Sequence, residues 1–60
     1  MKRIETQKGL KELLRRYQEA NADIEWINTI KGCIEEDLPM DEMDYENTPL
    51  ELRKLWKGLK

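Results

Sequence analysis

Sixty residues make at most one domain, and a chain this short buries only about 60% of the surface that it exposes when unfolded. Charged residues are 40% of the chain and apolar residues occur only in short runs, so the sequence contains no transmembrane segment. Cys33 is the only cysteine and the basic start lacks the apolar segment of a secretory signal, so we expect a cytoplasmic protein without disulfides.

The first predicted helix covers about residues 5–20. Its apolar residues stand at i, i+3, i+4 and i+7, which places them on one helical face: Leu10, Leu13, Leu14 and Tyr17. Gly9 weakens the first turns by about 1 kcal/mol relative to alanine, so the regular helix is expected to begin near this residue.

Residues 21–23 are compatible with two different structures. Asn21 can adopt the left-handed conformation that ends a helix, and Asp23 can then cap a second helix over about residues 24–37. The alternative is one uninterrupted helix across residues 5–37 that pairs as a coiled coil. We favour the helical hairpin because the coiled-coil seam would contain poorly suited residues, namely Tyr17, Ala20 and Lys31.

Residues 38–48 form an acidic connection, with Pro39 as its second residue. Ten wholly irregular residues are unusual in so small a domain. We therefore expect the three large side chains of this segment to fold back over the core: Met40, Met43 and Tyr45.

A third helix is predicted over about residues 49–58. Thr48, Pro49 and Glu51 match a capping box with a proline in the first helical position, and Gly58 suits the carboxyl-terminal cap. The apolar stripe of this helix consists of Leu52, Leu55, Trp56 and Leu59.

These elements indicate an all-α fold in a single domain, residues 1–60. We expect a small three-helix unit, an antiparallel hairpin plus the capped third helix, with a helix-swapped or coiled-coil dimer as the other arrangement. The apolar stripes exceed what one small core can cover, which favours self-association or a partner.

Charge is segregated along the chain. Residues 1–16 carry a net charge of +4, residues 17–48 carry −9 and residues 49–60 carry +3. Opposite charges either orient the packing of the helices or meet a partner of opposite charge. An acidic connection could engage a basic site on another protein, including one that normally binds nucleic acid.

The side chains needed for catalysis are scarce. Histidine and serine are absent, and the acidic neighbours of Cys33 disfavour a reactive thiolate. One cysteine without histidine excludes a zinc site within one chain, and the carboxylates of residues 37–46 lack the spacing of a calcium loop. We expect neither an enzyme nor a metal or cofactor site.

A small nucleic-acid-binding regulator is the alternative function. Basic residues decorate the first and third predicted helices, at Lys8, Lys11, Arg15 and Arg16 and at Arg53, Lys54, Lys57 and Lys60. The net acidic charge disfavours this interpretation, because phosphate contacts dominate nucleic-acid affinity.

The sequence favours a non-enzymatic protein-binding module, an accessory or regulatory protein such as an inhibitor. It would act as a homo-oligomer or by occupying the surface of a larger protein, with no membrane or small-molecule substrate involved. The expected apolar anchors are Trp26, Leu52, Leu55, Trp56 and Leu59. The expected steering charges are Asp41, Glu42, Asp44 and Glu46.

Overall fold

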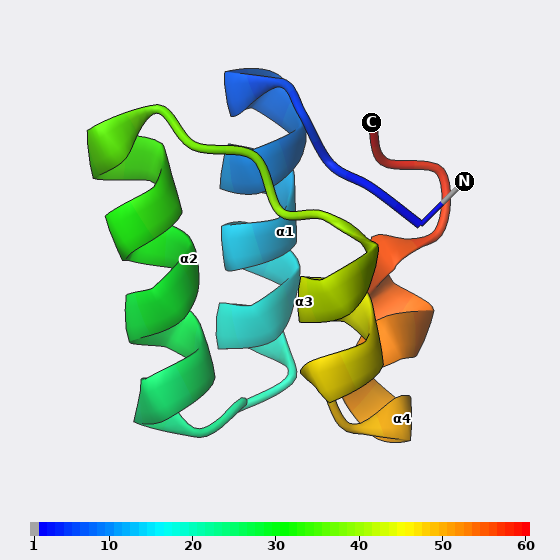
Figure 1. Ribbon diagram of the computed structural model, residues 1–60. Coiled ribbons are helices and arrows are strands. Elements are labelled where there is room, and N and C mark those ends of the chain that lie inside the picture. Colours follow the sequence, from blue (N-terminus) through cyan, green and yellow to red (C-terminus); the bar gives the residue numbers. More distant parts are fainter. Residues whose placement is uncertain (1) are drawn as a thin grey trace.

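The computed structural model describes residues 2–60, which are mostly helical. Two longer helices, α1 (Gln7–Glu19) and α2 (Ile24–Glu36), pack against each other (Figure 1). Three short elements follow: α3 (Glu42–Asn47), α4 (Leu50–Arg53) and a 3-10 turn, η1 (Lys54–Trp56). The all-α prediction is confirmed in this form, two packed helices plus short ones. None of the described helices is long and apolar enough to cross a membrane.

Helix α1 begins at Gln7, between the predicted bound of residue 5 and Gly9, because Thr6 caps it. The Thr6 hydroxyl accepts a hydrogen bond from the Gly9 N–H at 2.9 Å, which satisfies a donor that the first helical turn leaves free. The predicted apolar face is confirmed, since Leu10, Leu13 and Tyr17 are buried.

The chain breaks where the hairpin prediction placed the turn. Asn21 has φ 57°, in the left-handed region, and the Asp23 carboxylate accepts the Ile24 N–H at 3.0 Å at the start of α2. Asp37, with φ 56°, caps the carboxyl end of this helix, so α2 ends at Glu36, one residue before the predicted boundary. The hairpin is thus confirmed, and the alternative of one uninterrupted helix is wrong.

The acidic connection contains its own helix, α3. The Asp41 carboxylate accepts the Asp44 N–H and the Asp44 carboxylate accepts the Asp41 N–H, both at 3.1 Å, so the two residues form a capping box. Just before them, Met40 exchanges two backbone hydrogen bonds of 2.9 Å with Ile4. Met40 is buried as predicted, but Met43 is 70% exposed, so its predicted return to the core is wrong.

The helical segment that follows Thr48 is shorter than predicted: α4 continues directly into η1 and ends at Trp56. The predicted cap at Thr48 is wrong, because Pro49 occupies the N-cap position and no side chain there makes a capping hydrogen bond. The Thr48 hydroxyl donates instead to the Asp44 carbonyl at 2.7 Å, at the end of α3. Gly58 has φ 80°, as expected for a residue that ends a helical segment.

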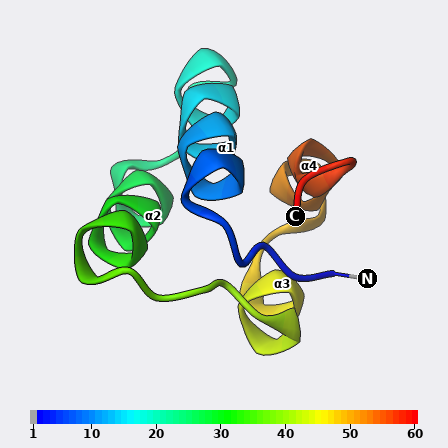
Figure 2. The same cartoon turned by 90° about the horizontal axis from the view of Figure 1, so that it is seen from above.

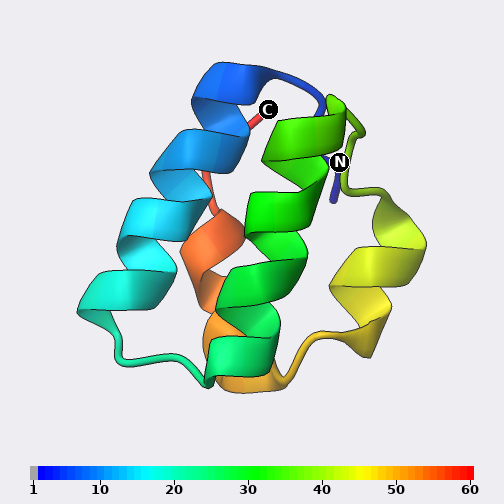
Figure 3. The same ribbon diagram turned by 90° about the vertical axis from the view of Figure 1, so that its left-hand side faces the viewer.

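The core lies between α1, α2 and the carboxyl-terminal elements. Seen from above, α1 stands between α2 and α4 (Figure 2), and from the side α2 covers the front of the molecule (Figure 3). The buried hydrophobic residues come from every part of the chain: Ile4, Leu10, Leu13, Tyr17, Ile30, Met40 and Trp56. The two ends of the chain lie near each other, joined by a 2.9 Å hydrogen bond from the Thr6 N–H to the Lys60 carbonyl.

Candidate binding surfaces

Trp56 belongs to the core. Its side chain is only 5% exposed, its indole N–H donates to the Tyr17 hydroxyl at 2.9 Å, and its ring meets Tyr45 edge-on at 5.1 Å between centroids. Burial raises the pKa of the Tyr17 hydroxyl, and the indole hydrogen bond acts in the opposite direction. An enclosed indole cannot reach a partner, so Trp56 is not a candidate anchor.

The other predicted anchors are half-buried. Trp26 on α2 packs partly against the core, as do three leucines of the carboxyl-terminal segment, Leu52, Leu55 and Leu59. These four side chains offer only part of their surface to a partner, and they come from two separate elements, α2 and the carboxyl-terminal segment.

The large side chains that face solvent most are others. Leu50 is 71% exposed and Met43 is 70% exposed. Ile24 and Leu38 are each more than half exposed. None of these four residues is among the anchors predicted from sequence, and Met43 was expected to be covered.

The structure brings the predicted steering charges together on α3. Asp41 and Asp44 occupy the capping box, and the N–H of Asp44 is the main group that lowers the pKa of Asp41. Glu42 and Glu46 are exposed and form no ion pair among the described residues. Two of the four carboxylates are therefore available to a partner without loss of a helix cap.

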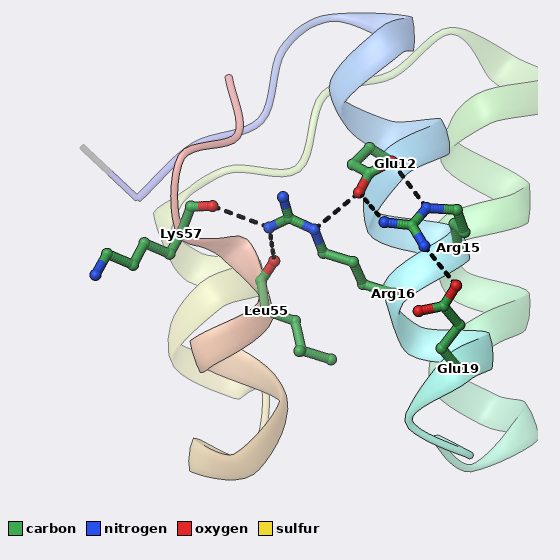
Figure 4. A network of polar contacts seen from close by, with 6 residues as sticks. All are labelled: Glu12, Arg15, Arg16, Glu19, Leu55 and Lys57. Atoms are coloured by element: carbon green, nitrogen blue, oxygen red, sulfur yellow. Dashed lines mark hydrogen bonds and ion pairs between the residues drawn. The ribbon is translucent and has the colours of Figure 1, made fainter.

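The basic carboxyl-terminal segment is held against α1 by a polar network (Figure 4). Arg16 donates to the Leu55 carbonyl at 2.8 Å and to the Lys57 carbonyl at 2.9 Å, and it also pairs with Glu12 at 3.0 Å. Hydrogen bonds from Arg15 and then from Arg16 lower the pKa of Glu12 to about 2. The network fixes the path of the carboxyl-terminal segment along α1.

A pocket of about 330 Å³ opens where the two ends meet. Its aromatic wall is formed by Tyr45 and Trp56, and its charged wall by five cationic residues: Lys2, Arg3, Arg53, Lys54 and Lys57. Lys2 and Arg53 each lie over the Tyr45 ring, 5.3 Å from its centroid. This arrangement suits an anion, because the cations are gathered in a concave, partly apolar site.

Chemistry at Cys33 has little support. The thiol is half-buried on α2, and burial, followed by the charges of Asp44 and Glu36, raises its pKa. A raised pKa reduces the thiolate fraction on which nucleophilic attack depends. Within residues 2–60, no three side chains of the histidine, cysteine, aspartate and glutamate types lie close enough together to hold a metal ion.

Comparison of the chain with protein-family models, with curated proteins and with solved structures finds no match.

Proposed function

We propose that this chain is a non-enzymatic protein-binding module that uses α3 as its contact surface. The observation that carries the proposal is the exposure of Met43, at 70%, on a helix whose other exposed side chains include the carboxylates of Glu42 and Glu46. Burial of a methionine side chain against a partner would stabilise the complex by on the order of 1.5–3 kcal/mol.

The charge of α3 defines the chemistry of the partner. The segment Asp41–Asn47 contains four acidic residues and no basic one. A protein surface with cationic residues around an apolar socket would complement it, with Met43 as the anchor and the two glutamates as steering charges. In this role the chain would be an accessory or regulatory protein that occupies the surface of a larger protein.

Site-specific photo-crosslinking tests this proposal. A photoreactive amino acid in place of Met43 should give a discrete crosslink to one protein in cells of the native host, and the same group in place of Thr29, exposed on α2, should not. With the purified partner, Met43→Ala should mainly accelerate dissociation, whereas E42Q together with E46Q should mainly slow association and weaken its salt dependence.

The matched control for the charge change is E35Q together with E36Q, which removes two exposed carboxylates from α2. Equal crosslinking from both positions, or equal effects of the two glutamine pairs, would contradict the assignment to α3.

Self-association is the other form of the proposal, with a second copy covering the exposed apolar side chains. Sedimentation over a wide range of protein concentration separates the two forms. A strict monomer that still crosslinks to a different protein through position 43 supports the larger partner, and a mass that grows with concentration and falls on Met43→Ala supports the dimer.

A further inference from the structure

The pocket between the chain ends has the charge of a polyanion site. Five of the residues that line it are cationic and none is acidic. Four of these cations form no ion pair with a carboxylate of the described residues: Lys2, Arg53, Lys54 and Lys57. Their charges are therefore not neutralised within the part of the chain that the structure describes.

The positive charge continues beyond this pocket. A second hollow, of about 460 Å³, shares Arg3 with it and extends to Lys60. A third, of about 880 Å³, shares Lys60 with the second and extends to Lys8 and Lys11 on α1. We call the cationic residues of these three adjoining hollows the basic track.

The two carboxylates along the basic track are already paired. Glu5 forms an ion pair with Arg3 at 3.2 Å, and Glu12 pairs with Arg15 and Arg16. These pairs leave the lysines as the dominant charges, so the local potential is positive although the whole chain has a net charge of −2.

The cations of the first pocket, at one end of the track, are preorganised. Arg53 donates to the Thr48 carbonyl at 2.7 Å and to the Glu46 carbonyl at 2.5 Å while it lies over Tyr45. The Arg16 hydrogen bonds to the Leu55 and Lys57 carbonyls fix the backbone that presents Lys54 and Lys57. A ligand would therefore meet a shape that exists before it binds, which lowers the entropy cost of binding.

We propose that the basic track binds the phosphate backbone of single-stranded nucleic acid. The three hollows follow one another around the carboxyl-terminal segment of a molecule whose largest extent is 23 Å. A flexible strand can follow so short and curved a path, whereas a rigid duplex cannot. A cationic groove that follows the backbone is also one of the features of proteins that bind single strands. The Tyr45 ring lies beneath Lys2 and Arg53, so here it positions the cations rather than stacking a base.

The test is fluorescence anisotropy of a labelled oligothymidylate with the full chain. Binding should appear at about 50 mM salt. For four phosphate contacts the affinity should fall about fiftyfold by about 200 mM salt, because each contact adds about 0.7 to the slope of log affinity against log salt concentration. By the same relation K54Q should weaken binding about eightfold at about 50 mM salt. Its matched control is K31Q, which removes an exposed lysine from α2, outside the track, and should leave affinity unchanged.

Three competitors test the nature of the ligand: polyglutamate, inorganic phosphate and a duplex of the same length. The proposal requires each to compete less well than the unlabelled single strand. It is overturned by the absence of binding at about 50 mM salt, by equal effects of K54Q and K31Q, or by equal or better competition from any of the three. Circular dichroism of both variants shows whether the fold is kept, so a loss of structure is not mistaken for a loss of contacts.

Discussion

Gly9 lies at the closest approach between α1 and the two ends of the chain. A Cβ atom at this position would stand 2.8 Å from the Cγ2 methyl of Ile4 and 3.2 Å from the carbonyl carbon of Lys60. Ile4 is fully buried and branched at Cβ, so its methyl group cannot swing away freely. The glycine that weakens the helix by its propensity is therefore required by the packing of the chain ends.

The two helical glycines should respond to alanine with opposite signs. Gly9→Ala is expected to lower the free energy of unfolding by about 1 kcal/mol, because overpacking costs more than the gain in helix propensity. Gly32→Ala on α2 should raise it by about 1 kcal/mol, since nothing lies within 4 Å of the added Cβ. Urea unfolding of both variants measures the two changes, and a stabilised Gly9→Ala would show that the close approach is absent.

At the scale of elements, Glu12 and Arg16 join α1 to the carboxyl-terminal segment. Glu12 holds two arginines, and one of them, Arg16, reaches the carbonyls at the end of η1. Loss of the Glu12 charge would leave Arg16 without the carboxylate that orients it. The polar part of the contact between α1 and the end of η1 thus depends on the ionisation of one side chain, beside the buried hydrogen bond from Trp56 to Tyr17.

Stability should consequently fall in acid as Glu12 becomes protonated. The folded-state pKa of Glu12 is about 2, below its ordinary value of 4.5, so the folded chain binds fewer protons in this range than the unfolded chain. The stabilisation is complete above pH 4.5 and is lost as the pH falls towards 2. Thermal unfolding across this range should show a shallower decline for Glu12→Gln than for the unchanged chain.

The control for this pH profile is Glu35→Gln, at an exposed position of α2 that forms no ion pair among the described residues. This variant should keep the full acid-induced decline. A Glu12→Gln profile with the same slope as the unchanged chain would show that the network does not stabilise the fold.

At the scale of the whole molecule, the core is closed by a residue outside every helix. Ile4 is 0% exposed and bridges to Met40 through two backbone hydrogen bonds of 2.9 Å. A single core in a chain of this size rarely supplies more than about 3–5 kcal/mol of stability. The amino-terminal segment is therefore part of the cooperative fold.

Two isoleucines test this conclusion with the same chemical change. Ile4→Ala should cost about 2–5 kcal/mol, enough to unfold much of the protein, because it opens a cavity in the core. Ile24→Ala, at a position that is 59% exposed, should change the free energy of unfolding by less than about 0.5 kcal/mol. Equal losses in thermal or urea unfolding would place Ile4 outside the core.

The local pattern determined the helical elements near the start of the chain. The apolar spacing of α1 and the Asn21 and Asp23 signals concern residues that are neighbours along the chain, so the hairpin followed from them. The capping box predicted at Thr48 did not form, because α4 begins one residue later, with Pro49 at the N-cap, and the Thr48 side chain packs and hydrogen-bonds at the end of the preceding helix instead. Local signals decide an element only where no tertiary or neighbouring contact offers a better partner.

Sequence alone showed that the chain is helical and that its ends are basic and its middle acidic. Only the tertiary structure decided that Trp56 is enclosed, that Met43 faces solvent, and that Lys2 and Lys57 meet in one pocket. These outcomes depend on contacts between residues far apart in the chain, such as the bridge between Ile4 and Met40 and the hydrogen bonds of Arg16. Periodicity tells which side of a helix is apolar, whereas the direction in which that side faces is set by what packs against it.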